Sequence, residues 1–112
     1  MIFIESSIFN KQLKNLEKKY PKIKNDFEDF KKNFNLELWK NLWKDIYKFR
    51  IWNSSIPVWK RWWFRIILFF VLKKDKVIPL TIYSKTDRNN INFKEIFVIL
   101  SEILKEIKNT KR

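Results

Sequence analysis

The sequence contains no cysteine, no histidine and no glycine. Without cysteine and histidine, disulfides, a catalytic thiol, imidazole acid-base chemistry and zinc sites built from these residues are excluded. A carboxylate metal site would need clustered acidic residues, but the nearest approach, Asp26, Glu28 and Asp29, stands among lysines and indicates a solvated helix face. We therefore expect no metal and no cofactor.

The missing glycine also bears on the turns. Tight turns recruit glycine where φ must be positive, and asparagine is the usual substitute. We predict that Asn53, Asn89 and Asn90 take these positions.

Long apolar runs are absent as well. The most apolar stretch, residues 66–72, is bounded by Arg65 and Lys73. It falls far short of the roughly 20 residues that span a bilayer, so it predicts a buried strand. Residues 1–5 carry no basic leader and no small-residue cleavage site, and we expect a cytoplasmic protein that does not bind membranes.

Positive charge is abundant. Lys and Arg number 25 against 12 Asp and Glu, giving a formal charge of +13 and a pI near 10.0. Such a field favours nucleic acid, an anionic membrane or an acidic protein as partner. The length of 112 residues with 46% apolar content suits one core, so we expect a single domain over residues 1–112.

Hydrophobic periodicity predicts the elements. Apolar residues at helical spacing follow the candidate caps Ser6, Ser7 and Asn92, and strand-like runs flank a polar turn at residues 73–76. The order is β-α-α-β-β-β-α, an α+β fold with a small, mainly antiparallel sheet packed against helices. We predict strands at residues 1–5, 45–52, 62–72 and 77–84, and helices at residues 8–20, 21–34 and 93–108.

The central segment is the most cationic for its length. Residues 39–65 hold seven Lys and Arg against one Asp, and the period-two pattern places Lys48 and Arg50 on one strand face. Charge interleaved with planar rings suits single-stranded RNA, with phosphates on the cations and bases on the rings. Alternatively, the rings pack in the core or an oligomer contact, and the cations line a solvated or acid-paired sheet face. The residues concerned are Lys48, Arg50, Lys60, Arg61 and Arg65, with Trp52, Trp59, Trp62 and Trp63.

Several segments resemble, in order, the RelE/HigB-type toxins of type II toxin-antitoxin pairs, within the RelE/ParE superfamily. Residues 9–16 (FNKQLKNL) and 18–21 (KKYP) are similar to the first helix of these toxins, and residues 46–51 (IYKFRI) and 64–67 (FRII) to two cationic strands. Residues 80–91 (LTIYSKTDRNNI) resemble the closing strand and the basic turn that precedes the last helix. The resemblance covers nearly the whole chain.

The resemblance implies a messenger-RNA endonuclease, often active in the ribosomal A site, that a cognate antitoxin neutralises. It aligns Lys48, Arg50 and Arg65 with catalytic cations, and Lys85 or Arg88 with a basic residue after the fourth strand. Tyr83 becomes a candidate for base stacking or proton handling. For Lys85 and Arg88, the alternative is an ordinary charged turn.

One departure from the family concerns a loop. Relatives commonly carry Gly-Lys-Ser-Gly-Gly, where this chain has residues 59–63 (WKRWW), which keep only the lysine, Lys60. The rings either fill the substrate groove or provide a stacking platform. If the rings provide a stacking platform, the residues predicted to bind RNA are Lys60, Arg61, Trp62, Trp63 and Arg88.

The chemistry expected is metal-free attack of a ribose 2′-hydroxyl on the adjacent phosphate. Lys48 acts as base if Arg50 and Arg65 lower its pKa from about 10.4, and Arg65 stabilises the phosphorane-like charge. Alternatives are a ParE-like gyrase inhibitor or an inactive relic that binds RNA or antitoxin. A membrane-surface protein is disfavoured, because the basic residues cluster on strands and a loop. The partner expected is an acidic, partly disordered antitoxin segment.

Overall fold

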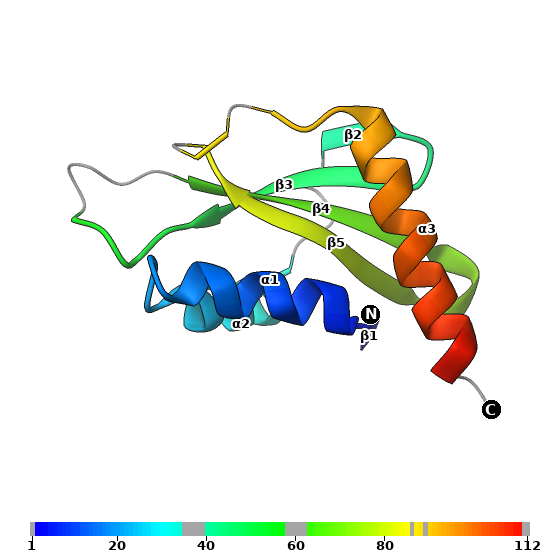
Figure 1. Ribbon diagram of the computed structural model, residues 1–112, viewed down its shortest axis with the longest axis horizontal. Coiled ribbons are helices and arrows are strands. Elements are labelled where there is room, and N and C mark those ends of the chain that lie inside the picture. The colour runs from blue at the N-terminus through cyan, green and yellow to red at the C-terminus, as the bar shows by residue number, and fades with distance from the viewer. Residues whose placement is uncertain (1, 35–39, 58–62, 86, 89, 111–112) are drawn as a thin grey trace.

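The computed structural model describes residues 2–34, 40–57, 63–85, 87–88 and 90–110 (Figure 1). It confirms the α+β class and the predicted element order, with one addition, the short strand β2. The elements are β1 (Ile2–Phe3), α1 (Ser7–Glu17), α2 (Ile23–Lys32), β2 (Lys40–Trp43), β3 (Ile46–Trp52), β4 (Trp63–Val71), a 3-10 turn (Leu72–Lys74), β5 (Lys76–Ser84) and α3 (Phe93–Thr110).

The strands form one mixed sheet in the order β1-β5-β4-β3-β2. β1 is parallel to β5, and the other neighbours are antiparallel. Helices α1 and α2 lie against one face, and α3 crosses the other (Figure 1). Among the described residues, no helix is long and apolar enough to cross a membrane.

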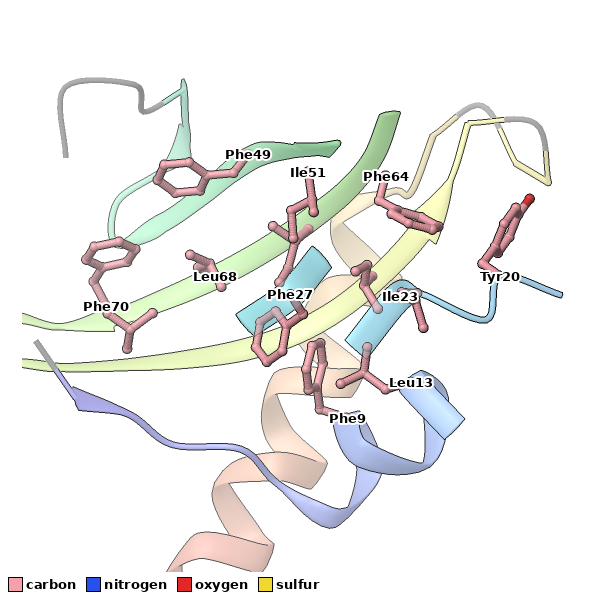
Figure 2. Close-up of a cluster of buried hydrophobic side chains, with 13 residues drawn as sticks. Phe9, Leu13, Tyr20, Ile23, Phe27, Phe49, Ile51, Phe64, Leu68 and Phe70 are labelled. Carbon is pink, nitrogen blue, oxygen red and sulfur yellow. The ribbon is translucent and has the colours of Figure 1, made fainter. Parts of the chain in front are cut away.

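Phenylalanine and aliphatic side chains fill the layer between the sheet and the first two helices. The Ser6 hydroxyl caps α1 by accepting from the Phe9 N–H at 3.1 Å, as the sequence predicts. Phe9 and Leu13, one helical turn apart, then point at the sheet together with Phe27 of α2 (Figure 2). Phe9 is fully buried, and removing such a ring costs about 3–5 kcal/mol.

The opposite face is only partly covered. Ile96 and Ile103 of α3 pack in a second cluster that includes Ile67 and Leu80 of the central strands. Asn92 caps α3, because its Oδ1 accepts from the Glu95 N–H at 2.8 Å. Further along the same sheet face Arg50, Trp52 and Trp63 are exposed, and the candidate site lies there.

The turn prediction was wrong for Asn53 and Asn90. Among the described residues, positive φ occurs at Lys44 (47°) and Asp75 (53°), each in a connection that leads into a strand. Asn53 is instead buried, and its Oδ1 accepts from the Ser55 N–H at 3.0 Å in an Asx turn. Asn90 does not have positive φ either, and Asn89 lies outside the described residues.

The prediction of a solvated acidic face holds for Glu28 and Asp29, which are exposed, and is wrong for Asp26. Asp26 is 8% exposed, and its carboxylate accepts from both the N–H and the hydroxyl of Ser54. The two hydrogen bonds tie α2 to the turn that follows β3. A buried carboxylate requires hydrogen-bond partners, and the partner of Asp26 lies 28 residues away in the sequence.

Candidate nucleic-acid interface

The alternation of β3 decides where its cations point. Phe49 and Ile51 belong to the core under α1 and α2, whereas Ile46 packs in the cluster under α3. Because successive side chains alternate between faces, Lys48 and Arg50 lie on the α3 side of the sheet. This arrangement agrees with the period-two prediction.

Arg65 reaches the same face from β4. Its neighbours Phe64 and Ile66 are fully buried on the opposite side, and its Cα pairs directly with that of Arg50. The Phe70 N–H donates to the Asp45 carbonyl, so residues 45 and 70 form a hydrogen-bonded pair. Hydrogen-bonded and non-hydrogen-bonded pairs alternate from there along β3 and β4. The two arginines therefore form a non-hydrogen-bonded pair, whose Cβ atoms approach to about 4.5–5.5 Å.

The opposed arginines have no acidic partner among the described residues. In the described part of the chain, no ion pair includes Arg50 or Arg65, whereas Lys19, Lys24, Lys31 and Arg88 each pair with an acidic side chain. Burial, and then the charge of Arg50, lower the pKa of Arg65, which is 9% exposed. Like charges directly opposite each other destabilise a sheet, so this pair is suited to hold an anion between its guanidinium groups.

Tyr83 extends the row onto β5, where it pairs with Arg65. Its hydroxyl is buried and makes no hydrogen bond within the described residues. Burial raises the pKa of Tyr83, although Arg65 and Arg88 act in the opposite direction. At neutral pH the phenol is therefore protonated and has a hydrogen bond to donate.

Arg88 approaches from the turn after β5. Its guanidinium lies 5.9 Å from the centre of the Tyr83 ring, and Glu95 holds it through two bonds of 2.9 and 3.1 Å. The same loop is tied to the turn that follows α1, because Lys19 Nζ lies 2.5 Å from Asp87 Oδ1. We name Arg50, Arg65, Tyr83 and Arg88 the basic row.

A pair of tryptophans adjoins the basic row. Trp52 and Trp63 are cross-strand partners two residues beyond Arg50 and two before Arg65. Their ring centres lie 4.4 Å apart at 70°, and they are 41% and 38% exposed. Exposed indole faces beside cations are suited to stack unpaired bases. Trp63 was a predicted RNA contact, whereas Trp52 was only noted among the interleaved rings, although its position two residues after Arg50 places it on the same face.

The other predicted site residues are placed as follows. Lys48 is half-buried on the face of the basic row, and Lys85 is exposed just beyond β5. Lys60, Arg61 and Trp62 lie outside the described residues. Within the described ranges, no three acidic side chains converge in a way that would hold a metal ion.

No protein-family model matches the chain, and no curated protein matches it in sequence.

Proposed function

We propose that the chain is the toxin of a type II toxin-antitoxin pair, a metal-independent endoribonuclease of the RelE/HigB type that cleaves messenger RNA and inhibits translation. One observation carries the proposal. Arg50 and Arg65 oppose each other without an acidic partner in the described chain, beside the unpartnered hydroxyl of Tyr83. A phosphate accepts hydrogen bonds from both guanidinium groups and relieves the repulsion between the arginines.

Single-stranded RNA suits this surface better than other anions. The Trp52–Trp63 pair is exposed beside the basic row, and unpaired bases stack on such rings. A duplex keeps its bases stacked internally and would use only the cations. The 2′-hydroxyl of RNA also supplies the nucleophile, so no external one is required.

The reaction we propose is transesterification within the RNA. The 2′-oxygen attacks the adjacent phosphorus, Lys48 in its neutral form takes the 2′-hydroxyl proton, and a bond from the 2′-oxygen to phosphorus forms. Arg50 and Arg65 stabilise the added negative charge of the pentacoordinate phosphorus. The bond from phosphorus to the 5′-oxygen breaks as Tyr83, whose buried hydroxyl must turn outward for this step, donates its proton to that oxygen. The products are a 2′,3′-cyclic phosphate and a 5′-hydroxyl.

The antitoxin partner is part of the same proposal. The chain carries a charge of +13, and large apolar side chains are exposed on α3, among them Phe93, Val98 and Leu104. An acidic, partly disordered segment that folds on contact complements both features.

Primer extension on total RNA after brief induced expression tests the proposal. The wild-type chain is compared with a Lys48→Ala, Arg65→Ala double variant and with a control, Lys73→Ala with Lys74→Ala, that removes the same charge from an exposed turn. We expect cuts within translated messages for the wild type and the control but not for the first variant. Growth arrest without cuts would replace the proposal with a ParE-like inhibitor, and neither effect would leave an inactive binding protein.

A further inference from the structure

A cavity of about 470 Å³ adjoins the basic row, between α2 and β3. Its volume is within the range of about 300–1,000 Å³ that is typical of small-molecule sites. The residues that line it include Asn25, Asp29 and Phe30 of α2 and Arg50 and Trp52 of β3.

Two of these residues connect the cavity to the proposed RNA site. Arg50 belongs to the basic row, and Trp52 belongs to the tryptophan pair. Arg50 and Trp52 lie on the α3 side of the sheet, whereas α2 lies on the other side. Among the described residues β2 pairs with β3 only as far as Lys48, so β3 is the edge of the sheet at Arg50 and Trp52. A base is joined to its phosphate through a single ribose, and a base attached to a phosphate at Arg50 would enter the cavity around this edge. Trp52 and Phe30 offer apolar surface for the faces of that base.

The polar lining differs from the cationic sheet face. Both carboxylate oxygens of Asp26 are occupied by Ser54. The Asp29 carboxylate, in contrast, takes part in no hydrogen bond or ion pair within the described residues. Asn25 lies one helical turn before Asp29 and therefore faces the same side of α2. The cavity thus combines a carboxylate acceptor with a neighbouring amide that both donates and accepts.

We propose that this cavity is a guanine-binding subsite, which we name the base pocket, and that Asp29 is its specificity-determining residue. The inference rests on the proposed binding of RNA to the basic row. Guanine presents N1–H and N2–H donors side by side, which one carboxylate accepts together, and its O6 accepts from the Asn25 amide. Adenine and cytosine place an acceptor beside their amino group, and uracil has one N–H between two carbonyl groups. Each of these bases would leave a carboxylate oxygen unpaired or opposed to an acceptor.

The test is fluorescence anisotropy with labelled seven-nucleotide RNAs that contain uridine except at the centre. The central nucleotide carries guanine, hypoxanthine, adenine, cytosine or uracil, with a 2′-O-methyl group that prevents cleavage there. We expect guanine to bind about tenfold tighter than adenine, cytosine or uracil, with hypoxanthine intermediate because it lacks the 2-amino group. Asp29→Asn should abolish this preference while the all-uridine RNA keeps its affinity within about twofold, because the phosphate contacts are unchanged.

Glu28→Gln is the matched control, since it removes the same charge from the adjacent exposed position of α2, which does not line the base pocket. It should retain the guanine preference. Equal binding of all five RNAs by the wild type, or a preference that survives Asp29→Asn, would overturn the base pocket and leave the RNA-binding proposal standing. Failure of every RNA to bind would overturn both.

Discussion

Replacing Arg50 by glutamine should stabilise the folded chain while it weakens RNA binding. Arg50 faces Arg65 in a non-hydrogen-bonded pair without an acidic partner in the described chain, and directly opposed like charges cost a sheet about 0.2–1 kcal/mol. Because Arg50 is exposed, water screens part of the repulsion, and we expect a gain of about 0.5 kcal/mol in the free energy of unfolding at low salt.

Urea denaturation measures this gain. Removing any cation from a chain of charge +13 relieves general repulsion, so the control is Lys11→Gln, on an exposed position of α1. The double-mutant cycle of Arg50→Gln and Arg65→Gln isolates the pair, and its repulsive coupling should disappear near 1 M salt, where the screening length falls to about 3 Å. A variant no more stable than Lys11→Gln, or a coupling of zero at low salt, would refute the reasoning.

Three further predictions concern single groups. Burial raises the pKa of Tyr83, so a spectrophotometric titration should show one phenol that ionises above the usual pKa near 10, and this transition should be absent from Tyr83→Phe. The same variant should bind RNA normally but cleave it about 10²–10⁴ times more slowly. Asp26→Ala removes both hydrogen bonds to Ser54 and should cost about 1.5–3 kcal/mol in urea denaturation, whereas an unchanged stability would show that water replaces the carboxylate. Hydrogen bonds from the Ser7 hydroxyl and N–H lower the pKa of Glu106, so the stabilisation from its carboxylate is present above the unfolded pKa near 4.3 and is lost as the pH falls through the folded pKa. Glu106→Gln should therefore flatten the decrease in the free energy of unfolding at acidic pH. An identical decrease in the variant would contradict the assignment.

The fold class was predictable because its signals are local. Helical spacing from Phe9 to Leu13 and the caps Ser6 and Asn92 are read directly from the sequence, and each is found in the structure. β2 was not predicted, because its four residues, Lys40–Trp43, are too few to establish a period. Its identity as a strand depends on its pairing with β3, which no local pattern records.

The candidate site was predictable only in part, for a related reason. Alternation along β3 places Lys48 and Arg50 on one face, but the pairing of Arg50 with Arg65 depends on the register between two strands. The hydrogen bonds from Ser54 to the Asp26 carboxylate join residues 28 positions apart. Nothing in the local sequence distinguishes this carboxylate from its solvated neighbours. Long-range polar contacts of this kind appear only when the elements are packed.

The register that aligns the basic row is set by the apolar residues between its members. Phe49 and Ile51 flank Arg50, Phe64 and Ile66 flank Arg65, and all four are buried on the opposite face of the sheet. A slip of one residue between β3 and β4 would turn these apolar side chains toward solvent and separate the arginines at the same time. The core under α1 and α2 therefore determines the geometry of a site on the other side of the sheet, and the repulsion between the arginines is sustained by apolar burial that they do not themselves provide.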